Sequence, residues 1–107
     1  EIIKKEGNMI LTQIKSSDYL VLLDDKGNQF TSVEFSNKLR QWMLNRTKRL
    51  IFVIGGAYGF SKEIYNRGNE KLSLSKMTFS HQMVRLFFLE QLYRGYTIIN
   101  NQPYHHK

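Results

Sequence analysis

The fold of this chain is decided by the stretch Arg49-Leu50-Ile51-Phe52-Val53-Ile54-Gly55-Gly56. Its five apolar residues in a row, stopped by two glycines, predict a short buried strand. A continuous apolar run, unlike an alternating one, is typical of strands that are covered on both faces, as in parallel sheets. We therefore expect this stretch to lie inside an α/β sheet.

Two other segments predict strands of the same sheet. Residues 19–23 are again continuously apolar, and residues 24–28 (Asp-Asp-Lys-Gly-Asn) have the chemistry of a turn, which is expected to end that strand. Residues 72–79 predict a third, short strand.

Helical signals lie between and around these strands. The apolar positions of residues 2–14 approximate a helical stripe, and residues 31–34 (Thr-Ser-Val-Glu) match a capping box that begins a helix running to about Asn45. Ser61 is expected to cap a short helix through about Arg67.

Ser80 begins the strongest helix, which is expected to run to about Tyr96 and to be followed by an extended tail at residues 97–107. The predicted apolar faces are Val33, Leu39, Trp42 and Met43 in the earlier helix and Met83, Val84, Phe87, Phe88 and Leu92 in this one. Because strands alternate with helices, we predict a single α/β domain over residues 1–107 with a mainly parallel sheet.

The composition limits the chemistry. With no cysteine, the chain has no disulfide, thiolate metal site or cysteine nucleophile, and its three histidines lack metal-ligand spacing. No apolar stretch approaches the roughly 20 residues of a membrane span, so we expect a soluble, cytoplasmic protein. Sixteen Lys and Arg against nine Asp and Glu give a net charge of +7, which suits a polyanionic partner but leaves nucleic-acid binding open.

Several local patterns are candidates for a functional site, and each has an ordinary structural explanation beside it. The glycines of residues 55–59 follow a strand and precede a helix, where open α/β sheets bind ligands, but a plain strand-to-helix turn has the same pattern. His81 and Arg85 lie on one helix face and are suited to a phosphate or a base, or are a surface pair. The aromatic residues of that helix fit a core or a dimer interface better than a stacking platform.

Five segments taken together resemble the RlmH family, the ribosomal RNA large-subunit methyltransferase H group. Phe52 to Ser61 are similar to its G-G-x-x-G segment, and residues 72–79 to its S-L-S-x-x-T segment. His81 to Arg85 match H-x-x-x-R, residues 90–94 match E-x-x-Y-R, and residues 101–105 match N-x-P-Y-H. The segments occur in the family's order, whereas residues 1–45 match mainly in pattern.

The resemblance implies a SPOUT-like α/β fold with a C-terminal trefoil knot, which is an exception to the rule against threaded chains. It also implies a homodimer that methylates N3 of a pseudouridine in large-subunit ribosomal RNA, with S-adenosylmethionine as the donor and the ribosome as the partner. Relatives begin with a further strand–helix–strand, so we expect this chain to be N-terminally incomplete.

The resemblance assigns residues to two groups. Those expected around the cofactor are Leu23, Gly55, Gly56, Gly59, Leu74, Ser75, Lys76, Met77, Thr78 and Phe79. Those expected on the substrate side are His81, Arg85, Tyr104 and His105. For removal of the N3 proton, His105 as general base and Arg85 as electrostatic stabiliser remain alternatives, and we favour positioning with electrostatics.

Two other interpretations remain. A non-catalytic basic RNA-binding module would bind RNA without the cofactor, and a basic structural dimer would bind neither. Binding of S-adenosylmethionine therefore discriminates the methyltransferase from both.

Overall fold

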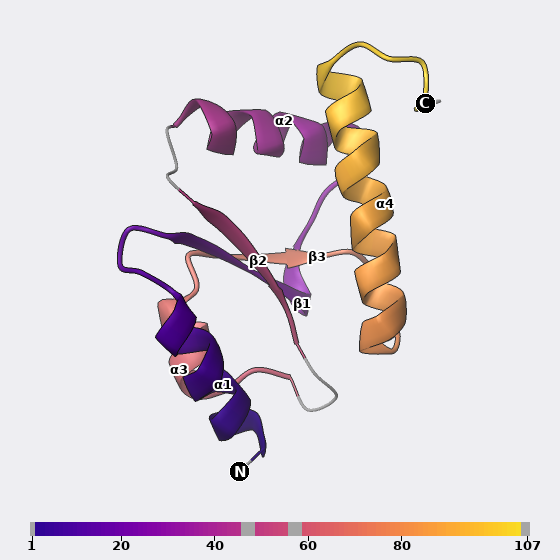
Figure 1. Cartoon of the computed structure of the whole chain (residues 1–107). Helices are drawn as coiled ribbons and strands as arrows, with labels where there is room; N and C mark the ends of the chain where they lie inside the picture. Colours follow the sequence, from indigo (N-terminus) through magenta and orange to yellow (C-terminus); the bar gives the residue numbers. More distant parts are fainter. Residues whose placement is uncertain (1, 46–48, 56–58, 106–107) are drawn as a thin grey trace.

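The computed structural model describes residues 2–45, 49–55 and 59–105. The elements are α1 (Ile2–Gln13), β1 (Tyr19–Gln29), α2 (Ser32–Leu44), β2 (Leu50–Ile54), α3 (Lys62–Arg67), β3 (Glu70–Ser73) and α4 (His81–Ile99). Figure 1 shows the strands between two helical layers, with α1 and α3 on one side and α2 and α4 on the other. The α/β class is therefore confirmed.

The described strands form one parallel sheet in the order β2-β1-β3. β1 has a neighbouring strand on each side, and helices cover both faces of the sheet, so its apolar run is buried. Leu20 and Leu22 pack with Ile64 of α3, whereas the alternate residues of the run pack toward α2 and α4. The apolar cluster on the side of α2 and α4 consists of Val21, Leu23, Phe35, Leu39, Trp42, Leu72 and Phe88. The predicted parallel sheet is confirmed.

β2 is less buried than expected. All five residues of Leu50–Ile54 are only half-buried, because among the described residues this strand pairs with β1 alone. The expectation of an interior strand is wrong at this position, although the strand itself is confirmed.

The caps are confirmed at all three predicted helix starts. The Thr31 hydroxyl accepts a hydrogen bond from the Glu34 N–H, and the Glu34 carboxylate accepts one from the Thr31 N–H. Ser61 and Ser80 accept in the same way from the backbones of Ile64 and Met83. These contacts satisfy backbone N–H groups that have no partner inside the first helical turn.

The predicted turn after the first strand is wrong, because β1 continues through residues 24–28 to Gln29. Leu23 and Asn28 are both paired with Leu72, so residues 24–27 are an irregular insertion within the strand. A Cβ on Gly27 would lie 2.8 Å from the Leu72 nitrogen, and glycine permits this close backbone approach.

The third strand begins earlier and is shorter than predicted, at Glu70–Ser73. Residues 74–80 form a loop, because serine side chains bond the backbone in place of the sheet. The Ser73 hydroxyl donates to the Ser75 carbonyl at 2.9 Å, and the Ser75 hydroxyl accepts from the Met77 N–H at 2.9 Å. This loop follows the carboxyl end of β3.

The sequence predicts an extended C-terminal segment, and this prediction is wrong. α4 continues to Ile99, and the chain then turns at Asn101, whose φ of 57° lies in the left-handed region that asparagine tolerates. The Gln102 N–H donates a hydrogen bond to the Thr97 carbonyl at 2.8 Å, which caps the end of the helix. After this turn the chain reverses direction and runs back beside α4 (Figure 1).

The helical faces are confirmed in part. In α2 Leu39 and Trp42 are buried as predicted, but Met43 is exposed and the unpredicted Phe35 is buried. In α4 Phe88 is the buried member of the predicted set, whereas Met83 is exposed. α4 therefore buries fewer apolar residues against the core than its sequence predicted.

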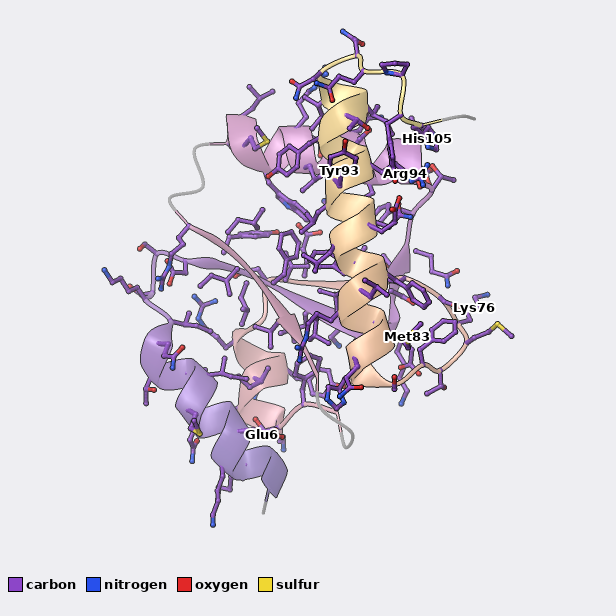
Figure 2. The ribbon with its side chains drawn as sticks, turned by 45° about the vertical axis from the view of Figure 1, so that its right-hand side comes forward. Glu6, Lys76, Met83, Tyr93, Arg94 and His105 are labelled. Atoms are coloured by element: carbon purple, nitrogen blue, oxygen red, sulfur yellow. The ribbon has the colours of Figure 1, made fainter. Side chains whose placement is uncertain are left out.

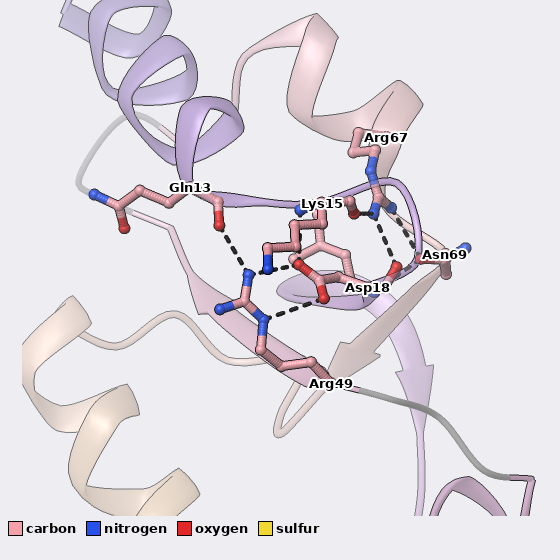
Figure 3. Close-up of polar contacts among 7 residues, drawn as sticks. Gln13, Lys15, Asp18, Arg49, Arg67 and Asn69 are labelled. Atoms are coloured by element: carbon pink, nitrogen blue, oxygen red, sulfur yellow. Dashed lines mark hydrogen bonds and ion pairs between the residues drawn. The ribbon is translucent and has the colours of Figure 1, made fainter.

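A polar cluster closes the amino-terminal edge of the sheet (Figure 3). The Arg49 guanidinium donates to both carboxylate oxygens of Asp18, at 3.1 and 2.6 Å, and to the Gln13 carbonyl at 2.9 Å. Arg67 donates to the carbonyls of Lys15 and Asp18 at 2.9 and 2.8 Å. These contacts join the end of α1, the start of β2 and the end of α3.

Candidate functional site

A cavity of about 600 Å³ lies at the carboxyl ends of the strands. Leu23 of β1, Ile54 at the end of β2 and Leu72 of β3 line its wall, and the loops after β2 and β3 and the start of α4 close around it. Helices α2 and α3 follow β1 and β2 on opposite faces of the sheet, so the chain diverges at this edge. Open parallel sheets bind their ligands at such a point.

Most of the residues predicted around a cofactor meet at this cavity. Those on its wall are Leu23, Gly55, Gly59, Leu74, Ser75, Met77, Thr78 and Phe79. Lys76 belongs to the same loop but is exposed and does not line the cavity. Gly56 lies outside the described residues.

The two described glycines of the loop after β2 have different roles. A Cβ on Gly55 would lie 3.2 Å from the Phe60 ring, so the absence of a side chain lets the ring approach the end of β2. Gly59 has a φ of 82°, a conformation that side chains other than glycine rarely adopt. The loop can therefore turn back beside the cavity.

Asp24 and Tyr65 form a polar wall that the sequence analysis did not predict as part of the site. The Tyr65 hydroxyl donates to Asp24 at 2.8 Å, and the Lys26 N–H donates to the same carboxylate at 3.1 Å. Burial acts to raise the pKa of Asp24, but these hydrogen bonds outweigh it and hold the pKa below its ordinary value. Burial and the neighbouring Asp24 raise the pKa of Tyr65 to about 12.

The cavity therefore combines apolar strand ends with an ionised carboxylate, and the adjacent Asp25 also lines it. One signal in the sequence could have identified these residues. The pair Asp24-Asp25 directly follows a buried apolar run, and polar residues at the carboxyl end of a parallel strand face the ligand edge of the sheet.

The residues predicted on the substrate side separate into two places. His81 lines the cavity, and the exposed Arg85 lies one turn further along α4. Tyr104 contacts Glu90, in the middle of the same helix. His105 contacts Arg94, one turn further along the helix (Figure 2). His81 and Arg94 are thirteen residues apart, which is about 20 Å along a helix axis.

The second location is a closely connected polar cluster. Arg94 donates to one oxygen of Glu90 through Nε at 3.0 Å and Nη2 at 2.6 Å, and the Tyr104 hydroxyl donates to the other oxygen at 3.0 Å. The hydrogen bonds from Tyr104 and Arg94 lower the pKa of Glu90, and the bond to Glu90 raises the pKa of Tyr104. The tail is thus fixed on α4 through an ionised carboxylate.

The outer face of α4 is apolar and exposed. Leu86, Leu89 and Tyr93 are 59%, 57% and 57% exposed, and Met83 and Tyr96 extend the same surface along the helix. A contiguous apolar surface of this kind is typical of interaction sites.

No three histidine, aspartate or glutamate side chains in the described ranges gather as metal ligands. No described helix is both long and apolar enough to cross a membrane.

An α/β fold with a cavity at the carboxyl edge of a parallel sheet is shared by many ligand-binding proteins. Comparison with known proteins identifies the family within this class. Residues 1–105 match the family described as "Predicted SPOUT methyltransferase". The chain belongs to this SPOUT methyltransferase family.

Similar proteins carry the name ribosomal RNA large subunit methyltransferase H. The chain is 61% identical to that of Christiangramia forsetii over 103 residues, 59% to that of Parabacteroides distasonis over 104, and 58% to that of Flavobacterium johnsoniae over 104. The matches cover 96 or 97% of this chain and 66% of each relative, so the chain spans just under two thirds of their length.

Proposed function

We propose that this chain is the cofactor-binding part of a methyltransferase that modifies N3 of a pseudouridine in 23S ribosomal RNA, in the cytoplasm. The observation that carries the proposal is the cavity at the ends of the three strands, on which eight predicted cofactor residues meet. The names of relatives about 60% identical support the RNA as substrate. The trefoil knot and the ribosome as partner belong to the same proposal.

The residues present fit S-adenosylmethionine. The cavity volume of about 600 Å³ lies within the range of about 300 to 1,000 Å³ for small-molecule sites. Leu23, Leu72 and Leu74 offer apolar surface to the adenosine, and the carboxylates of Asp24 and Asp25 suit a ligand that carries positive charge. Ser75 and Thr78 add hydroxyl groups for hydrogen bonding to the ligand.

The chain's own groups act by positioning and electrostatics. When bound, S-adenosylmethionine supplies an activated methyl group to N3 of the base, whose proton leaves to solvent. His81 at the cavity and Arg85 beside it are placed to hold the base and a phosphate at the opening. The net charge of +7 favours association with RNA.

We propose a homodimer as the acting form. Within one chain the cavity lies at the start of α4, whereas Tyr104 and His105 contact its middle and its carboxyl-terminal half, so one copy does not gather the whole substrate-side set. A second copy packed on the exposed face of α4 would supply the other wall of the site and cover Leu86 and Leu89.

Calorimetric titration with S-adenosylmethionine tests the proposed cofactor site. We expect Thr78→Trp, at an exposed residue on the cavity wall, to weaken binding by more than tenfold because the indole takes up space that the ligand needs. Thr12→Trp, at an exposed residue of α1, is the matched control and should bind as the parent does. If the parent binds large-subunit RNA but no cofactor, the RNA-binding module replaces the methyltransferase as the better account.

A further inference from the structure

The tail cluster determines which nitrogen of His105 carries a proton. Arg94 Nη1 lies 3.0 Å from Nδ1 of His105. A guanidinium has donors but no acceptor, so Nδ1 must be the acceptor in this contact. A neutral imidazole has one N–H, which is then on Nε2.

The surroundings of Arg94 hold its Nη1 group toward His105. Its Nε and Nη2 atoms are engaged by one oxygen of Glu90, on the same helix. Its guanidinium carbon lies over the Tyr104 ring, 5.1 Å from the ring centre. The Tyr104 ring in turn packs edge-to-face with that of Tyr93, with 4.7 Å between the ring centres. With one edge and one face of the guanidinium occupied, its orientation toward the imidazole is fixed.

We propose that Arg94 is a positioning residue that holds His105 as the Nε2–H tautomer, so that His105 offers the RNA base a hydrogen-bond donor and not a proton acceptor. The assignment of a base as ligand rests on the proposed function, whereas the tautomer rests on the cluster alone. The lone pair of Nδ1 is used by Arg94, and Nε2 already has its proton.

This tautomer decides between two roles for His105. A general base needs a free lone pair directed at the proton that it removes. The Nε2–H group instead suits a carbonyl oxygen of the base, on which negative charge accumulates when N3 loses its proton to solvent. His105 is then a catalytic residue that stabilises charge, and Glu90 and Arg94 act through it.

Nitrogen-15 NMR of the full chain measures the tautomer directly. We expect Nδ1 of His105 to have the shift of an unprotonated ring nitrogen and Nε2 that of a protonated one, with His81 as the exposed reference in the same spectrum. Arg94→Met should bring both nitrogens of His105 to the averaged shifts of His81, and Arg94→Lys should restore part of the difference.

The matched control for these variants is Arg40→Met. Arg40 contacts the carboxyl-terminal end of α4, at the Ile99 carbonyl 3.4 Å away, and in the described part of the chain its side chain makes no hydrogen bond with His105. The His105 signals should be unchanged in this variant. A proton on Nδ1 in the parent chain, or a signature that survives Arg94→Met, would overturn the proposal.

Turnover of two His105 variants tests the donor role. His105→Gln keeps an N–H donor without a basic nitrogen, and His105→Ala keeps neither. We expect the alanine variant to lose about 10² to 10³ in kcat, as for removal of one donor to a developing oxyanion, and the glutamine variant to lose less than about tenfold. Equal loss in both would make His105 a base and contradict the donor role.

The experiments distinguish failure of the tautomer proposal from failure of the proposed function. A parent chain that binds neither cofactor nor RNA removes the methyltransferase, but the NMR shifts still decide whether Arg94 fixes the tautomer.

Discussion

Asp18 is a carboxylate at the amino-terminal edge of the sheet whose side chain is 2% exposed. Hydrogen bonds from the Arg49 guanidinium, followed by that from the Lys15 N–H, lower its pKa below the ordinary value of 3.8. A carboxylate whose pKa is lower in the folded than in the unfolded chain stabilises the fold above its unfolded pKa. That stabilisation disappears as the pH falls through the folded pKa.

We predict that Asp18→Asn lowers the thermal midpoint at pH 7, because Arg49 loses its ionised partner. The difference between parent and variant should shrink as the pH falls from about 4 through the lowered pKa of Asp18. Thermal melts followed by circular dichroism between pH 2 and 7 measure it. Glu6→Gln, at an exposed carboxylate of α1, is the control and should show no comparable loss at pH 7. A difference that is constant with pH would contradict the assignment.

At the scale of elements, α2 and α4 cross where Gly95 faces Leu39. A Cβ on Gly95 would lie 2.7 Å from Leu39 Cδ1, and Leu39 is 1% exposed and so has little room to move. Glycine is unfavourable inside a helix by about 1 kcal/mol relative to alanine. Its presence at this buried position therefore reflects the close approach of the two helices.

We predict that Gly95→Ala lowers the free energy of unfolding by about 1 kcal/mol, because overpacking of about 1 to 3 kcal/mol outweighs the gain in helix propensity. Urea denaturation measures the change. In the background of Leu39→Ala the same substitution should be neutral or stabilising, because the clashing methyl group is gone. An increase in stability from Gly95→Ala in the parent chain would show that the helices do not meet as closely as described.

At the scale of the whole molecule, the exposed apolar face of α4 is the surface best suited to a second copy. Leu86 and Leu89 are each more than half exposed, and α4 is about 28 Å long at 1.5 Å per residue. Burying this face in a symmetric dimer would remove apolar side chains from water and bring two copies of the site together.

We predict that the parent chain sediments as a dimer and that Leu89→Glu shifts it to the monomer, because two carboxylates would be buried at the interface. Sedimentation equilibrium measures this. Leu44→Glu is the matched control, since Leu44 is 72% exposed at the end of α2, and it should leave the dimer intact. A monomeric parent, or equal effects of the two substitutions, would exclude α4 as the interface.

Signals that act over a few residues were sufficient for much of the fold. The capping hydroxyls of Thr31, Ser61 and Ser80 and the apolar run of β1 gave the order of helices and strands. A cap or a run of apolar residues has its physical effect within one helical turn or one strand, so it can be recognised in the sequence. The glycines of residues 55–59 were equally compatible with a plain strand-to-helix turn, and only the resemblance to a G-G-x-x-G segment assigned them to the cofactor.

Several of the errors concern contacts between distant segments. The continuation of β1 beyond Leu23 depends on pairing with Leu72, and the exposure of Met83 depends on how α4 lies on the sheet. Asp24 joins the site because Tyr65 of α3 reaches it across the end of the sheet. No local pattern contains these partners.

The sequence by itself determined the class of fold and the starts of the capped helices, because each follows from neighbouring residues. Only the tertiary structure decided that Tyr104 and His105 lie on Glu90 and Arg94, beyond the first turn of α4 that borders the cavity. The physical reason is that a left-handed turn at Asn101 reverses the tail, and the hydrogen bonds that hold it there exist only once the helix is formed.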